Sequence, residues 1–152
     1  MIDVEIEDEA WAKAVPDLEA VVIQAAGEAF RGAEGPLTVL LADDDAVAEL
    51  NERFRQKTGP TNVLSFPAAA NPEGHLGDIA LAYGVCAREA AEQGKTLSQH
   101  LSHLVVHGVL HLLGYDHQDD GEAEAMEALE RAVLESLGVP DPYAAERPQV
   151  RR

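Results

Sequence analysis

The chain has 152 residues, a formal net charge of −17 at pH 7 and one cysteine. This length suits one domain with a single core, the charge argues against broad attraction to nucleic acids or anionic membranes, and a lone cysteine excludes an intramolecular disulfide. The acidic N-terminal residues lack the basic region of a signal peptide, and no stretch reaches the roughly 18 apolar residues of a membrane span, so we expect a cytoplasmic protein without membrane contact.

The first half of the chain predicts strands and helices in alternation. Residues 3–6 alternate as in a short strand, and residues 11–30 carry apolar side chains at helical spacing. Leu37–Ala42 is a continuous apolar run of strand length, and the carboxylates at 43–45 can cap a helix over residues 46–54. This order is typical of a parallel sheet with crossover connections.

The second half adds a pair of strands and then becomes helical. Residues 62–66 and 77–83 have the composition of strands, and the loop between them leaves no room for a crossover helix. These two strands should therefore pair antiparallel. Helical periodicity follows in three segments, at residues 85–93, 97–113 and 122–137.

These elements predict an α+β fold. We expect one domain over residues 1–143, with a mostly parallel four-stranded sheet, one antiparallel strand and about five helices. Residues 144–152 are expected to form a mobile tail. Cys86 has apolar neighbours, so we expect a small core side chain and not a nucleophile.

Three histidines mark a candidate metal site in the C-terminal half of the chain. His107 and His111 are four residues apart, so on a helix they share one face and can bind the same ion. Gly114 can adopt the left-handed conformation that ends a helix, and the returning chain would bring His117 to that ion. Three imidazoles suit Zn²⁺ or another divalent transition metal and leave a fourth position open, as in catalytic zinc sites. We predict one such ion per chain, on this helix and the turn after it.

A fourth histidine, His103, shares the helical face of the predicted ligands. It lies about 12 Å from His111 along the helix axis, so we assign it to the cleft wall or to the support of a ligand. The spacing of the predicted ligands is that of the metzincin proteases, in which a glutamate general base follows the first histidine. Gly108 stands at that position here, which weakens the inference of a protease.

Basic residues are concentrated in one stretch of this acidic chain. Arg53, Arg55 and Lys57 are three of the 11 Lys and Arg residues, and they precede the segment PTNVLSFP. They could form a locally basic cleft on an acidic body. Such a cleft would admit a polyanion at one place only.

Several segments together resemble one known family. RQKTGPTNVLSFP, LGDIALA and HLVVHGVLHLLGYDH, followed by the acidic segment EAEAMEALE, are similar to the YbeY family of bacterial endoribonucleases. The resemblance runs from about residue 50 to residue 143, and the order of elements before it agrees. Two features depart from the family pattern, an extended loop at residues 68–74 and an unusually acidic surface.

The resemblance implies a metal-dependent, single-strand-specific endoribonuclease that acts in ribosomal RNA processing, notably at the 3′ end of 16S rRNA, and in ribosome quality control. The family's zinc ligands fall on His107, His111 and His117, and its cleft arginine falls on Arg55, which would act in catalysis and bind substrate phosphate. Other candidate substrate-binding residues are Arg53, Lys57 and Ser65, and candidates for supporting an imidazole are His103, Asp78 and Asp116.

Two other classes of function stay open at this point. A zinc metallopeptidase or related hydrolase could use the same ligands, although Gly108 counts against it. A noncatalytic ribosome-assembly factor could hold the zinc as a structural ion. Its acidic segment at residues 122–135 could bind a basic ribosomal protein, although a solvated helix face is the simpler interpretation. The expected partners are RNA and a ribosomal subunit or its proteins.

Overall fold

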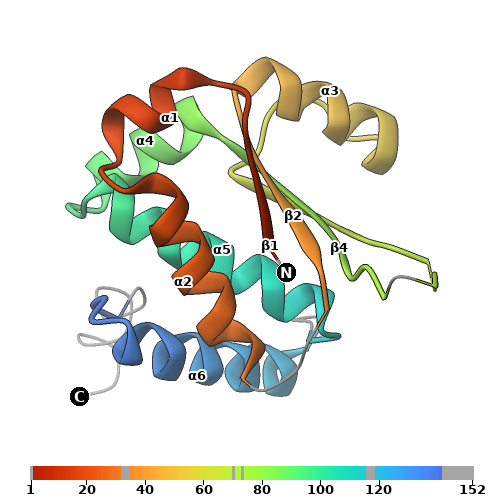
Figure 1. Cartoon of the computed structure of the whole chain (residues 1–152), viewed down its shortest axis with the longest axis vertical. Coiled ribbons are helices and arrows are strands. Elements are labelled where there is room, and N and C mark those ends of the chain that lie inside the picture. The colour runs from red at the N-terminus through yellow and green to blue at the C-terminus, as the bar shows by residue number, and fades with distance from the viewer. Residues whose placement is uncertain (1, 32–34, 70, 73, 116–118, 142–152) are drawn as a thin grey trace.

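The computed structural model describes residues 2–31, 35–69, 71–72, 74–115 and 119–141, and in these ranges it contains one four-stranded sheet (Figure 1). The strands lie in the order β1-β2-β4-β3. β2 is parallel to both β1 and β4, whereas β3 pairs antiparallel with β4 at the edge of the sheet. The predicted mixed sheet is therefore confirmed. The strands are β1 (Ile2–Ile6), β2 (Leu37–Ala42), β3 (Val63–Pro67) and β4 (Gly77–Ala82).

Six helices accompany the sheet in the described ranges, one more than expected. The prediction of a single helix over residues 11–30 is wrong, because the helical conformation is interrupted between α1 and α2. Pro16 forces the residue before it into an extended conformation, and Val15 has φ −118° and ψ 109°. The helices are α1 (Glu9–Ala14), α2 (Leu18–Phe30), α3 (Asp44–Arg55), α4 (Tyr83–Glu92), α5 (Leu97–Leu112) and α6 (Asp120–Ser136).

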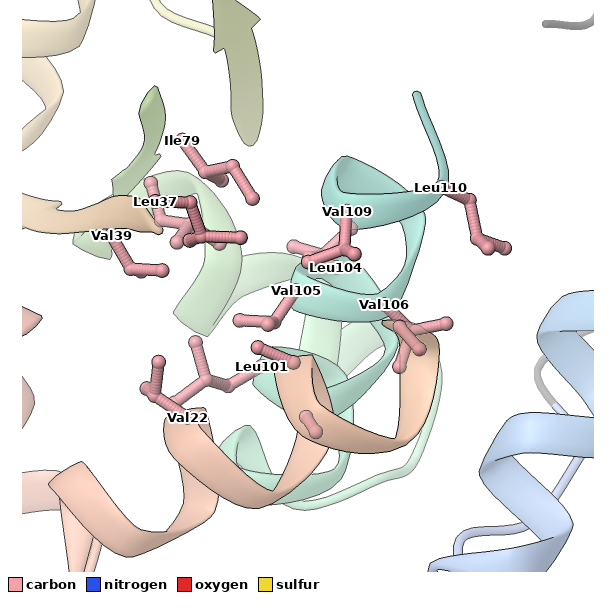
Figure 2. Close-up of a cluster of buried hydrophobic side chains, with 14 of the residues drawn as sticks. Val22, Leu37, Val39, Ile79, Leu101, Leu104, Val105, Val106, Val109 and Leu110 are labelled. Carbon is pink, nitrogen blue, oxygen red and sulfur yellow. The ribbon is translucent and has the colours of Figure 1, made fainter. Parts of the chain in front are cut away.

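The two faces of the sheet are covered to different extents. Leu37 and Ile79 point into the main core, where they meet buried side chains of α2 and α5 (Figure 2). α6 packs against α2 and α5 (Figure 1). The opposite face is covered by α3 through a smaller cluster that includes Val47 and Ala80. None of the helices in the described ranges has the length and apolarity that a bilayer span requires.

Helix α5 positions the predicted metal ligands. It begins with a capping box, in which Thr96 and Gln99 each accept a hydrogen bond from the other's backbone N–H. Leu101, Val105 and Val109 repeat every four residues and are fully buried, so one stripe of the helix faces the core. The histidines at 103, 107 and 111 follow these residues by two positions, about 200° around the helix. They therefore lie on the other side of α5, away from that stripe.

The end of α5 follows the predicted glycine turn. Gly114 has φ +105°, in the region that glycine enters with little steric cost. Its N–H donates to the carbonyl of His111 at 3.0 Å, and the N–H of Tyr115 donates to the carbonyl of Leu110 at 3.0 Å. These bonds satisfy carbonyls that the helix end leaves without partners. The helix therefore ends with the glycine turn that the sequence predicts, three residues after His111.

Candidate active site

A cleft of about 630 Å³ opens between the edge strand β3 and the C-terminal ends of α3 and α5. Arg55 enters it from the end of α3, and Ser65 from β3. His107 and His111 enter it from α5. Segments that are far apart in the sequence thus bring a guanidinium group and two imidazoles to one cavity.

His107 and His111 lie side by side in the lining of this cleft. Their ring centroids are 4.7 Å apart and the ring planes meet at 78°, so two successive turns of α5 present imidazoles side by side. His117 and Asp116 lie outside the described residues, so the third predicted ligand stays a prediction. In the part of the chain that the structure describes, no three histidine, cysteine or carboxylate side chains are grouped to hold a metal ion. The pair fits two ligands of a transition-metal site, since imidazole nitrogen suits such metals.

A buried carboxylate supports the first of these histidines. Glu130 of α6 is 1% exposed, and its Oε2 lies 2.6 Å from Nδ1 of His107. Its other oxygen, Oε1, lies 3.0 Å from Nε2 of His103, whose side chain is 14% exposed. His103 thus contacts the group that supports His107. Sequence reasoning missed Glu130 because it treated the acidic segment as one solvated face.

The sequence nevertheless carried a signal for the burial of Glu130. Met126, Glu130, Val133 and Leu134 have the i, i+4, i+7, i+8 spacing of one buried helical face. A carboxylate at a core position of that stripe needs a hydrogen-bonding partner. The two histidines of α5 supply it.

Gly108 allows α5 to lie directly against the sheet. A Cβ atom at this position would meet the Cδ1 atom of Ile79 at 2.9 Å, closer than side chains pack without moving. A side chain at this position would therefore require Ile79 to move. With glycine at this position, the chain lacks the general base that metzincins carry after the first histidine, which argues against a peptidase of that type.

Only one residue of the basic stretch lines the cleft. Arg55 does so, whereas Arg53 and Lys57 are exposed and lie outside the lining. Arg53 is two residues before Arg55, about 200° around α3. It lies 3.7 Å from Glu49 and its guanidinium carbon is 5.2 Å from the centre of the Phe54 ring.

Comparison with known proteins identifies the family of the chain. The family model described as Endoribonuclease YbeY matches residues 2–138. The chain belongs to the YbeY family. The Endoribonuclease YbeY of Maricaulis maris is 48% identical over 150 residues, which cover 97% of this chain and 94% of that protein. That of Paramagnetospirillum magneticum is 49% identical over 155 residues, covering 93% and 94%. The solution structure of TM1509 from Thermotoga maritima shares the fold, with a TM-score of 0.57, 24% identity and coverage of 100% and 99%.

In this YbeY-family chain, Ser65 faces the same cleft as the histidines. Its hydroxyl donates to the carbonyl of Gly108 at 3.5 Å, a long contact that leaves the oxygen able to meet a ligand. Ser65 pairs across the sheet with Ile79, the residue against which Gly108 packs. Both therefore point to the α5 side of the sheet.

Asp78 lies on the opposite side of the YbeY-family sheet. It precedes Ile79, and successive side chains of a strand alternate between faces. It lines a separate groove of about 700 Å³ with Phe54 and Phe66, and its Oδ1 lies 3.1 Å from Nε2 of His75. The imidazole that it contacts is thus His75, and the structure does not bring it to His107 or His111.

Besides Glu130, Cys86 and His100 are buried titratable groups outside the cleft lining. Cys86 is fully buried, as predicted, and burial raises the pKa of its thiol far above its ordinary value. Such a thiol stays protonated and is a poor nucleophile. Burial also lowers the pKa of His100, against the opposing effect of its hydrogen bond to Glu89, whose Oε1 lies 2.8 Å from Nε2. This pair joins α4 to α5.

Proposed function

We propose that this YbeY-family chain is a metal-dependent, cytoplasmic endoribonuclease that cleaves single-stranded segments of ribosomal RNA. The observation that carries the proposal is the meeting of two imidazoles and one guanidinium group in a single open cleft. The relatives in the family are endoribonucleases by name. The imidazoles would bind a metal ion, and the guanidinium group would bind a phosphate group in the same cleft.

The proposed metal is Zn²⁺ or another divalent transition ion, held by His107, His111 and His117. Imidazole is a common ligand of these ions, and the described pair already lies on one face of α5. When bound, such an ion supplies a Lewis acid for a phosphoryl oxygen. The protein's own part is to present imidazole nitrogen atoms at fixed positions in the cleft.

Arg55 would bind the scissile phosphate. Its planar, positively charged guanidinium group can donate two parallel hydrogen bonds to phosphate oxygens. Among the described residues, no carboxylate forms an ion pair with Arg55, so its charge is available to an anion. It would stabilise the negative charge that grows on the phosphate during cleavage.

Tyr115 supports the preference for single strands. Its side chain is 41% exposed and lines the cleft beside Gly114. An exposed aromatic ring can stack on an unpaired base, whereas a base inside a duplex has both faces covered by its neighbours. The cleft thus favours RNA whose bases are free to turn outwards.

Metal removal tests the proposed function. Purified protein should cleave a single-stranded ribosomal RNA fragment, lose that activity after treatment with a chelator, and regain it when Zn²⁺ is returned. A fully paired RNA of the same sequence serves as the control and should resist cleavage. Cleavage that persists after all metal has been removed would contradict the proposal.

Binding to free RNA should be weak and should depend only slightly on salt. The net charge of −17 repels RNA at long range, and Arg55 is the one basic residue of the stretch 53–57 that lines the cleft. Even if the exposed Arg53 and Lys57 also contact phosphates, the logarithm of affinity should fall with the logarithm of salt concentration with a slope equivalent to at most about two or three phosphate contacts. Affinity measured across salt concentrations checks this.

The same measurement repeated with ribosomal subunits tests the proposed partner. If a subunit or a ribosomal protein supplies further contacts, affinity should rise well above that for naked RNA. Strong binding to free RNA with a steep salt slope would contradict this proposal, since it would require a longer basic surface than the chain provides.

A further inference from the structure

We infer that Glu130 is a positioning residue, which holds His107 in the tautomer that carries its proton on Nδ1 and so presents Nε2 to the cleft. The inference concerns the chain's own hydrogen bonds, and its use in metal binding rests on the proposed function. Three observations carry it: the contact distances, the burial of the carboxylate and the orientation of the two histidines that it joins.

The contact between Glu130 and His107 is short. Oε2 lies 2.6 Å from Nδ1, a distance typical of a hydrogen bond that involves a charged group. Each oxygen of the carboxylate faces an imidazole nitrogen, and carboxylate oxygens accept hydrogen bonds, so we assign Nδ1 of His107 as the donor. In a neutral imidazole the other nitrogen, Nε2, then carries the lone pair that a metal ion requires.

The orientation of the ring follows from the same contact. The two nitrogens of an imidazole point in roughly opposite directions, and Nδ1 of His107 points at the buried Glu130. His107 also lines the cleft, with 24% of its side chain exposed. The exposed part is therefore the side that bears Nε2.

His103 fixes the carboxylate itself. Its Nε2 lies 3.0 Å from Oε1 of Glu130, so each oxygen of the carboxylate has an imidazole partner. A carboxylate bound through both oxygens cannot rotate without losing one hydrogen bond. This arrangement gives His103 a role in the support of a ligand, one of the two roles considered for it from the sequence.

Burial of Glu130 is costly for folding alone. A buried charged group loses its hydration, and partners repay this loss only in part. The neighbouring core positions of α6, Met126 and Leu134, are apolar, and an apolar residue at 130 would suit that stripe. A role in orienting a metal ligand explains why a carboxylate stands at this position, because such partners fix the orientation and tautomer of an imidazole.

Nitrogen NMR of the metal-free wild-type protein tests the tautomer directly. The shifts and ring couplings of His107 should show a protonated Nδ1 and a lone pair on Nε2. A proton on Nε2 would overturn the inference. This measurement needs no metal, so it stands apart from the chelation experiment, whose failure would remove the proposed function and leave the tautomer assignment intact.

Glu130→Gln tests the consequence for binding. The amide has the same shape but only one accepting oxygen, so it cannot accept from both imidazoles. Zn²⁺ affinity, measured by competition with a coloured chelator, should fall about 10- to 100-fold, and the nitrogen spectrum of His107 should change. Glu124→Gln is the matched control, since it removes the same charge from an exposed position of α6. Unchanged affinity in a folded Glu130→Gln protein would overturn the inference; if that variant does not fold, the wild-type spectrum decides.

Discussion

Replacing His111 with alanine should remove nearly all bound metal from the purified protein. The variant loses one of three proposed ligands, and two imidazoles alone hold a divalent ion far more weakly than three. Its fold should persist, because His111 lies in the open cleft and not among the fully buried residues of α5. Metal content per chain, measured by elemental analysis after dialysis, checks this.

His103→Ala is the matched control for His111→Ala. It removes an imidazole from the same helix, but His103 contacts Glu130 and does not line the cleft. Most of the bound metal should remain, because all three proposed ligands stay and Glu130 keeps its contact with His107, even though the carboxylate loses its second imidazole partner. Equal loss of metal in the two variants would show that the ligand assignment is wrong.

Replacing Arg55 with alanine should lower RNA cleavage by about 100-fold or more, as the loss of one electrostatic contact to a transition state typically does. Metal content and fold should not change, since Arg55 is exposed at the end of α3. Arg55→Lys should recover only part of the rate, because an ammonium group cannot reproduce the two parallel hydrogen bonds. The rate of cleavage of a labelled single-stranded RNA at saturating metal measures this.

Arg53→Ala supplies the control for charge alone. It removes one positive charge two residues away, from a side chain paired with Glu49 and outside the cleft lining. Its effect on cleavage should be much smaller than that of Arg55→Ala. If the Arg55→Ala protein cleaved RNA at the wild-type rate, Arg55 would be an ordinary surface residue with no role in catalysis.

Local signals in the sequence predicted most of the secondary structure and the common face of two candidate ligands. The strands and the later helices carry periodicities that depend only on each segment's own residues. The short connection before β4 required an antiparallel pair, because a parallel crossover needs a dozen or more residues. The four-residue spacing of His107 and His111 fixed their common face, and Gly114 marked the turn after them.

One local signal was available and was overlooked. Pro16 lies inside the segment predicted as a continuous helix, and proline disfavours the helical conformation of the residue before it. The apolar periodicity on either side concealed this break. Pro16 thus explains the interruption between α1 and α2.

The tertiary structure decided which side chains meet. Glu130 and His107 are 23 residues apart in the sequence. Neither segment by itself predicts that α6 packs against α5 so that these two side chains come into contact. Asp78 and Ile79 are neighbours on β4, but their side chains point to opposite faces of the sheet. The helices that cover each face determine that Ile79 packs against Gly108 and that Asp78 lines the separate groove.

Tertiary packing also decides that Arg55 lines the cleft and Arg53 does not. Helical geometry predicts that they point to different sides of α3, but only the packing of α3 on the sheet determines which of them reaches the cleft. A sequence specifies local conformation through each residue's own preferences and near neighbours. Contacts between distant segments depend on how whole elements pack, so the sequence alone determined the candidate ligands, and the tertiary structure determined the groups that surround them.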